Sequence, residues 1–155
     1  MWGLARSLVS ADRAAEAPPI VDECLRLAAG KVVHPGLVPG MIHIRLRHFA
    51  KINDAAGCRA TAEMWEGLKR ADAASLYNAA CNRAVTAAVI RAGDPSDGAA
   101  KDAADEADRA MDWLKQAVAA GCKNAAHIKQ DTDLDTLRTR EDFKQLIAEL
   151  EAGRM

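Results

Sequence analysis

The run Leu76-Tyr77-Asn78-Ala79-Ala80-Cys81 begins the part of the sequence that says most about the fold, and this part extends to Glu151. A second run, at 110–118, reads Ala-Met-Asp-Trp-Leu-Lys-Gln-Ala-Val. In both runs apolar residues recur at intervals of three and four, which is the spacing of an amphipathic helix. We expect these helices to pair and to stack like a solenoid, an architecture that presents a binding surface more often than a catalytic centre.

Composition indicates an all-α protein of one domain. The chain has 155 residues, of which 50% are hydrophobic but only 4% aromatic, because alanine supplies much of the apolar content. Alanine is the best helix former. The mixture of β-branched and aromatic residues that is typical of a sheet protein is missing.

Charge and cysteine usage argue against several classes of protein. The formal net charge is -1 and the two signs are interspersed, so we expect no nucleic-acid partner and no membrane partner. No run approaches the roughly 18 apolar residues that span a bilayer, and Arg6 and Asp12 interrupt any secretory leader. The four cysteines have no Cys-x-x-Cys spacing, which predicts free thiols in a reducing cytoplasm.

Helix-breaking and capping residues divide the chain into about seven helices. The Pro18-Pro19 pair, the loop at 93–98 and Gly121 are turn or stop signals. Asp72 is predicted to cap the helix that follows it, and the segment 139–142 resembles a capping box. We expect helices at 3–15, 20–29, 39–56, 58–70, 73–92, 99–120 and from 143 onward, with a short helical turn at 125–130.

The expected helices differ in the side that faces a core. The helix at 73–92 is apolar around most of its circumference, so it should be covered on more than one side. The helix at 99–120 carries the cleanest single stripe: Ala103, Ala107, Ala110, Leu114 and Ala117. In the two preceding helices the residues expected inward are Ile42, Leu46 and Phe49, then Ala60, Met64, Gly67 and Leu68.

Two helix–turn–helix units in this pattern resemble the tetratricopeptide repeat, a 34-residue unit. The second unit has matching core positions at Tyr77, Ala80, Cys81 and Ala84, then at Ala110, Leu114, Ala117 and Val118. Two features depart from the family: the insertion around 93–98, and the absence of the signature Trp and Gly-Tyr residues. The resemblance implies a stack of antiparallel helix pairs over 39–151. Residues 1–38 are then a cap or the remnant of a preceding repeat, and 152–155 a frayed end.

The stretch 41–151 is also similar to the C-terminal repeat tails of large bacterial multidomain proteins that carry a Ser/Thr-kinase-type domain upstream. The run Asp131-Thr-Asp-Leu-Asp-Thr-Leu-Arg, followed by a helix that begins with Phe, carries this likeness. The resemblance implies the regulatory tail of a signalling kinase. The kinase motifs themselves, a Gly-rich loop, His-Arg-Asp and Asp-Phe-Gly, do not occur in these residues.

The resemblance further implies a peptide-binding groove, because the first helix of each unit lines the concave face in that family. The polar residues expected there are His43, Arg47 and Lys51 in one unit and Ser75, Asn78, Asn82 and Thr86 in the next. Cations beside amides suit an acidic peptide or a free C-terminal carboxylate. The alternative is that these side chains form an ordinary solvated face.

Other chemistry finds little support in the sequence. The Asp131-x-Asp133-x-Asp135 run resembles the start of an EF-hand loop, but Thr136 replaces the required Gly, so capping is the expected role. The histidines are not spaced as a metal pair, and no local signature selects a nucleophile. We therefore expect no metal, no cofactor and no enzymatic activity.

Together these patterns predict a non-catalytic protein–protein interaction or scaffold module, monomeric or weakly homodimeric. Two alternatives stay open: a structural spacer without a groove, and a small α-helical enzyme whose site forms only in three dimensions. A deep pocket with convergent titratable groups would favour the enzyme. An apolar open end near Trp2 would favour the dimer.

Overall fold

The computed structural model describes residues 16–28 and 36–153, which contain helices and short connections and no strand. The prediction of an all-α fold is therefore confirmed for this part of the chain. The helix expected at 3–15, and Trp2, lie outside the described residues. The elements are α2 (Ala17–Ala28), α3 (Leu37–Lys51), α4 (Ala55–Glu66), α5 (Ala73–Gly93), α6 (Asp97–Ala119), α7 (Ala125–Gln130), the 3₁₀ helix η2 (Thr132–Leu137) and α8 (Glu141–Glu151).

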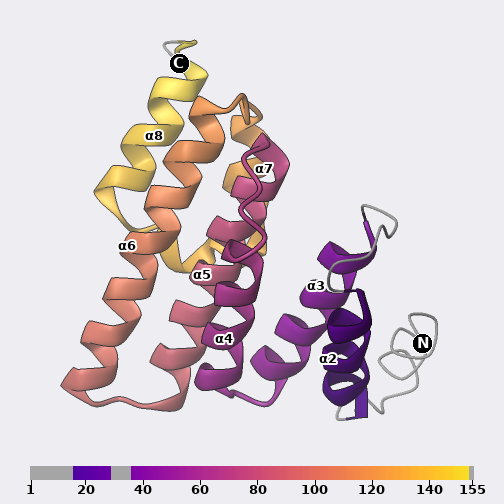
Figure 1. Cartoon of the computed structure of the whole chain (residues 1–155). Helices are drawn as coiled ribbons and strands as arrows, with labels where there is room; N and C mark the ends of the chain where they lie inside the picture. The colour runs from indigo at the N-terminus through magenta and orange to yellow at the C-terminus, as the bar shows by residue number, and fades with distance from the viewer. Residues whose placement is uncertain (1–15, 29–35, 154–155) are drawn as a thin grey trace.

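Helices that follow one another in the sequence pack side by side from α2 through α6 (Figure 1). The long helices α5 and α6, of 21 and 23 residues, form an antiparallel hairpin. After α6, η2 packs against α5, while α7 packs on α8. This arrangement is compatible with a helical-repeat stack, and the tetratricopeptide arrangement in particular stays a prediction.

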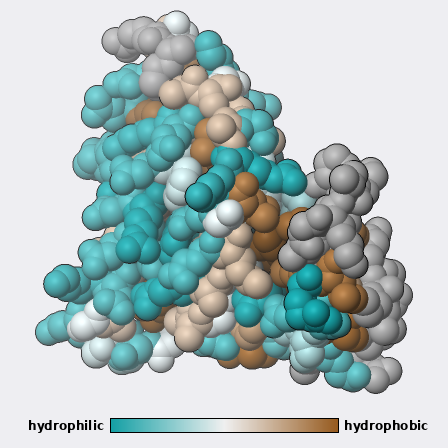
Figure 2. All heavy atoms as spheres, in the orientation of Figure 1, coloured by the Kyte–Doolittle hydropathy of each residue, from teal (hydrophilic) through white to brown (hydrophobic). Residues whose placement is uncertain are grey.

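The core of the C-terminal part is built on small residues between α5 and α6. Ala80, Ala84 and Ala87 on α5 and Ala107 and Ala110 on α6 are all buried in one cluster. Because alanine has no side chain beyond Cβ, the two helices can lie close together over their length. Larger residues from α6, α7, η2 and α8 fill the rest of the cluster: Leu114, Ile128, Leu134, Leu137 and Phe143. Hydrophilic residues cover most of the outer side formed by α6 and α8 (Figure 2).

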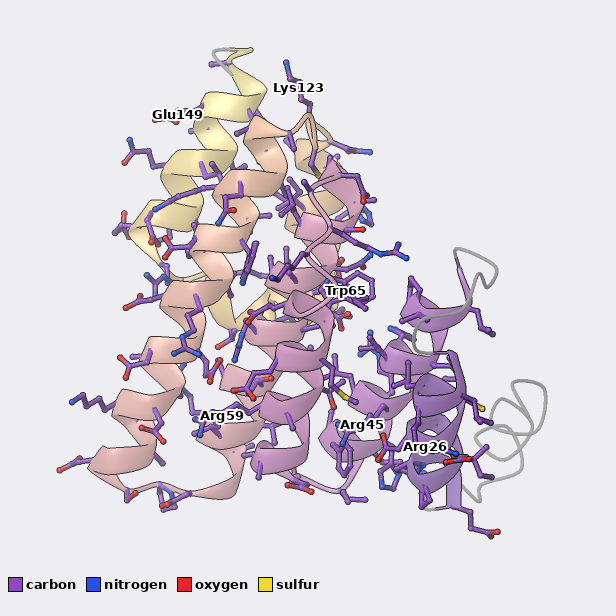
Figure 3. The ribbon with its side chains drawn as sticks, viewed as in Figure 1. Arg26, Arg45, Arg59, Trp65, Lys123 and Glu149 are labelled. Carbon is purple, nitrogen blue, oxygen red and sulfur yellow. The ribbon has the colours of Figure 1, made fainter. Side chains whose placement is uncertain are left out.

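A buried ion-pair network joins α4, α5 and α6. Arg83 on α5, 1% exposed, donates through Nε and Nη2 to both carboxylate oxygens of Glu66, at 2.7 and 2.6 Å. Its Nη1 donates to Glu106 on α6 at 2.8 Å. Arg59, which Figure 3 labels on α4, donates to the other oxygen of Glu106 at 2.8 Å. The network specifies how the three helices align, because a shift of one helix would leave a buried charge unpaired.

Several boundaries confirm the sequence prediction. The helices expected at 73–92, 99–120 and 125–130 are α5, α6 and α7. Asp72 caps α5 as expected, since its side chain accepts from the Ser75 N–H at 2.9 Å. Gly121 follows α6 with a φ of 109°, a left-handed conformation that favours glycine.

The predicted helix at 39–56 is wrong at its C-terminal end. The chain leaves α3 at Lys51, passes through Asn53 with a φ of 55°, and begins α4 under the cap of Asp54. Gly57, which lies between the two helices expected at 39–56 and 58–70, is therefore inside α4. A Cβ at Gly57 would lie 2.3 Å from Cδ1 of Phe49, so glycine is what allows α3 and α4 to approach here.

The predicted inward face of α4 is also wrong. The buried residues are Cys58, Thr61, Ala62 and Trp65, whereas Met64 is 37% exposed and Gly67 is exposed. Both sets have helical spacing, so periodicity alone does not choose between them. Packing of α4 against both α3 and α5 makes the choice.

The capping box expected at 139–142 does not form. The N-cap of α8 is Arg140, and no side chain caps the helix there. Asp142 instead accepts from the Arg140 guanidinium at 2.9 Å and from the Phe143 N–H at 3.0 Å. The helix begins one residue later than the box requires, which leaves Thr139 outside it.

Candidate functional site

An open groove runs along α5, with α3 on one side and the α7–η2 segment on the other. Its larger part has a volume of about 490 Å³, and a smaller part of about 240 Å³ continues from it toward the start of α3. His43, Asn78 and Asn82 line both parts and so make the groove continuous. We call it the α5 groove; its other lining residues include Pro39, Gly40, Trp65, Ala73, Ala74, Tyr77, Cys81, Cys122, His127, Asp131 and Asp133.

The structure brings four of the seven predicted site residues to this groove. His43 projects from α3, and Asn78 and Asn82 lie one turn apart on α5. Arg47, one turn after His43, lies at the margin and donates to Asp133 at 2.6 Å. Arg47 and Asn78 therefore border the same groove.

The other three predicted residues do not line the groove. Ser75 is buried, and its backbone carbonyl accepts from the indole N–H of Trp65 at 2.9 Å. Thr86 is fully buried and donates to the Asn82 carbonyl at 2.8 Å within α5. Lys51 is exposed at the last turn of α3, beyond the lining residues. The prediction is wrong for Ser75 and Thr86 because other elements cover α5 on nearly every side, so these two polar side chains are not open to solvent.

Asn82 lines the groove and has a side-chain amide nitrogen without a hydrogen-bond partner. Its residue is only 6% exposed, and its Nδ2 is buried without a hydrogen-bond partner. A buried amide N–H₂ without an acceptor costs about 1–3 kcal/mol. Such a group calls for an explanation. Because Nδ2 itself has almost no solvent-exposed surface, an acceptor that arrives with a ligand would reach it only if the Asn82 side chain turns toward the groove that it lines.

The wall of the groove opposite α3, which α7 and η2 form and which we call the far wall, was not predicted from the sequence. The Tyr77 hydroxyl on α5 donates to Oδ2 of Asp131 at 2.7 Å, and His127 lies 3.9 Å from the same oxygen. Asp131 also caps η2, because it accepts from the Asp133 N–H at 3.0 Å. The expected capping role of the Asp131 run is thus confirmed. No sequence signal, however, indicates that this segment returns to α5.

Electrostatics favour the charged form of the Asp131 carboxyl group. Burial alone would raise the pKa of Asp131, but the Tyr77 hydroxyl, the Asp133 N–H and the charges of His127 and Arg47 together hold that pKa below its usual value. For His43, burial lowers the pKa, the charge of Arg47 lowers it further, and the charge of Asp133 opposes both. His43 is therefore biased toward the neutral imidazole.

Several titratable side chains lie close together in the groove, as they would in a catalytic centre: Tyr77, Cys81, His127 and Asp131. Burial and the nearby Asp131 carboxylate raise the pKa of the Cys81 thiol, the opposite of what activates a nucleophilic cysteine. Burial and the hydrogen bond to Asp131 likewise raise the pKa of Tyr77. Together with the Tyr77–Asp131 hydrogen bond, this cluster anchors η2 to α5.

Residues 16–28 and 36–153 contain no group of three or more His, Cys, Asp or Glu side chains arranged to hold a metal ion. In the same residues, no helix is both long enough and apolar enough to cross a membrane. Trp65 and Trp113 pack into the fold, with their indole N–H groups bonded to Ser75 and Glu66.

No protein-family model matches the chain, and no curated protein or solved structure is significantly similar to it. Residues 16–28 and 36–153 form an all-helical arrangement with an open groove along the largely buried helix α5.

Proposed function

We propose that this domain is a non-catalytic protein–protein interaction module that binds a peptide segment of a partner in the α5 groove. The observation that carries the proposal is the buried, unpartnered amide of Asn82 on the groove floor. The carbonyl groups of an extended peptide, or a carboxylate, would supply the acceptor that this amide lacks. Asn78, one turn away and exposed, would bind the same segment.

The chemistry of the groove favours a partner that is acidic or ends in a free carboxylate. His43 and Arg47 lie on one wall, and Arg47 is a strong donor to carboxylate oxygens. The opposing carboxylates, Asp131 and Asp133, already accept hydrogen bonds from Tyr77 and Arg47. Their charge is therefore partly compensated before a ligand arrives. In a tetratricopeptide-like arrangement this groove would be the concave face. The sequence resemblance suggests that the domain is the regulatory tail of a bacterial cytoplasmic kinase.

Two alternatives are less well supported. A structural spacer gives no reason to keep an unsatisfied amide buried beside an open groove, because an apolar residue at Asn82 would be more stable. An enzyme would place its nucleophile or acid–base pair where neighbouring charges activate it, and the pKa of Cys81 is raised by its surroundings.

The proposal is tested with a displayed library of random peptides that have free C-termini. The wild-type domain should enrich peptides with acidic residues or a defined C-terminus. Asn82→Leu and Asn78→Ala should lose this enrichment, whereas Gln116→Ala, which removes an exposed amide on α6 outside the groove, should keep it.

Stability separates a binding role of Asn82 from a structural one. Asn82→Leu removes an unpaired buried donor, so the free energy of unfolding should stay unchanged or rise while binding is lost. A variant that unfolds more easily yet selects the same peptides would show that Asn82 serves the fold, and the proposal would then be wrong.

A further inference from the structure

The ion pair between Arg47 and Asp133 crosses the margin of the α5 groove. It joins Nη2 of Arg47 on α3 to Oδ2 of Asp133 on η2 at 2.6 Å, between residues 86 apart in the sequence. Asp133 lines the groove, and so does His43, one turn before Arg47 on α3. The pair therefore connects the two walls between which a ligand would lie.

The two partners are held very differently. The side chain of Asp133 is 17% exposed, and its backbone N–H is bonded to Asp131, which Tyr77 anchors to α5. The side chain of Arg47 is 46% exposed and sits on a long, flexible stem. If the pair separates, the carboxylate stays in place and the guanidinium moves.

We infer that the Arg47–Asp133 pair is a latch across the α5 groove, and that a ligand carboxylate opens it by taking Arg47 from Asp133. The inference rests on the proposed function and adds its regulation: Asp133 acts as an internal competitor for the cation that an acidic ligand needs. Acidic peptides must displace Asp133, and neutral peptides gain nothing from doing so. The latch thus lowers affinity for acidic ligands and leaves affinity for neutral ones unchanged.

The latch is weak enough for a ligand to open. An ion pair with one partner half exposed is partly solvated and screened by salt. Removal of Asp133 as a competitor should therefore raise the affinity for an acidic peptide by about fivefold at most. Removal of Arg47 should lower it, because the ligand then loses the cation altogether.

The chain offers a closely matched control. Asp135 lies two residues after Asp133 on the same 3₁₀ helix and pairs with Arg138 at 2.7 Å. Asp135 does not line the groove. Asp133→Asn and Asp135→Asn thus make the same chemical change on the same element, one across the groove and one away from it.

The test measures the affinity of the peptide most enriched by the wild-type domain in the displayed library. A second peptide, in which every Glu and Asp is replaced by Gln and Asn and the C-terminus is amidated, serves as the neutral probe, which has no carboxylates. Asp133→Asn should bind the acidic peptide up to about fivefold more tightly and the neutral peptide equally well. Asp135→Asn should match the wild type for both peptides, and Arg47→Gln should lose affinity for the acidic peptide alone.

The outcomes distinguish this inference from the proposed function. If the wild type binds the acidic peptide and Asp133→Asn binds it no better, the latch does not exist while the groove still functions. A gain for both peptides would show that the groove has merely loosened, which also overturns the latch. Selection of acidic peptides by Asp133→Asn alone would support a latch that is closed in the wild type. If no protein in the set selects any peptide, the proposed function fails, and the inference with it.

Discussion

Replacement of Arg83 by methionine should destabilise the domain strongly. Methionine matches the aliphatic part of the side chain but removes the cation that faces Glu66 and Glu106. The Glu106 side chain is 4% exposed, so its charge would be left in a poorly solvated site with only the half-exposed Arg59 as a partner. Breaking a buried pair from one side costs about 3–5 kcal/mol, mostly because of the uncompensated charge that remains.

The free energy of unfolding is measured by urea denaturation, followed by circular dichroism. The Arg83→Met variant should lose about 3–5 kcal/mol, a large part of the roughly 5–15 kcal/mol of a typical domain. Arg91→Met is the control, since Arg91 is an exposed arginine on the same helix; its effect should stay within about 0.5 kcal/mol. An unchanged dependence on urea concentration would show that both variants unfold from the same native fold.

A triple variant separates the charge effect from simple loss of packing. Adding Glu106→Leu and Glu66→Gln to Arg83→Met removes the stranded charges and keeps an acceptor for the Trp113 indole. Most of the lost stability should then return, because apolar replacements of buried ion pairs are often neutral. A loss below about 1 kcal/mol for Arg83→Met alone, equal to that of the control, would refute the argument that these charges are shielded from water.

Three further predictions concern pH, packing and the groove wall. Burial would raise the pKa of Glu66, but the donors from Arg83 and Trp113 lower it below its usual 4.5. The free energy of unfolding should therefore be highest above that pH and fall as the pH drops below it. Denaturation between about pH 6 and pH 3 measures this, and Glu66→Gln should show a weaker pH dependence. Gly57→Ala should cost about 1–3 kcal/mol in thermal unfolding, because the new Cβ meets the Phe49 ring at 2.3 Å; an unchanged melting temperature would mean that the helices separate freely. Tyr77→Phe should lower the free energy of unfolding by about 1–3 kcal/mol, because Asp131 loses its hydroxyl donor. Amide hydrogen exchange in η2 should become faster in this variant. Unchanged exchange there would show that the Tyr77–Asp131 hydrogen bond does not anchor η2.

Local signals in the sequence predicted much of the C-terminal part. The bounds of α5 follow from the cap at Asp72, the loop at 93–98 and the periodicity between them. The apolar circumference of α5 correctly indicated burial on several sides, and α4, α6 and η2 pack against it. Prediction was poorer around 52–70, where two faces of one helix carry similar patterns and the turn at Asn53 has no Gly or Pro to mark it.

The candidate site was predicted only in part. His43, Asn78 and Asn82 lie in the α5 groove, and they were selected because the tetratricopeptide resemblance implies that polar residues on the first helix of each unit line the concave face. The same reasoning selected Thr86, which is fully buried and bonded to its own helix. It could not find Asp131, because η2 meets α5 through contacts such as that between Tyr77 and Asp131, which are 54 residues apart in the sequence.

Local patterns in the sequence were enough to predict that this chain forms helices, where α5, α6 and α7 begin and end, and that α5 and α6 form an alanine-rich pair. These features depend on interactions within a few residues, such as capping, helix propensity and the spacing of apolar side chains. Only the tertiary structure decided that Arg83 would be buried between two glutamates and that Arg47 would meet Asp133 across a groove. Those contacts join residues that are distant in the sequence, and the packing of whole helices sets them, which no local pattern encodes.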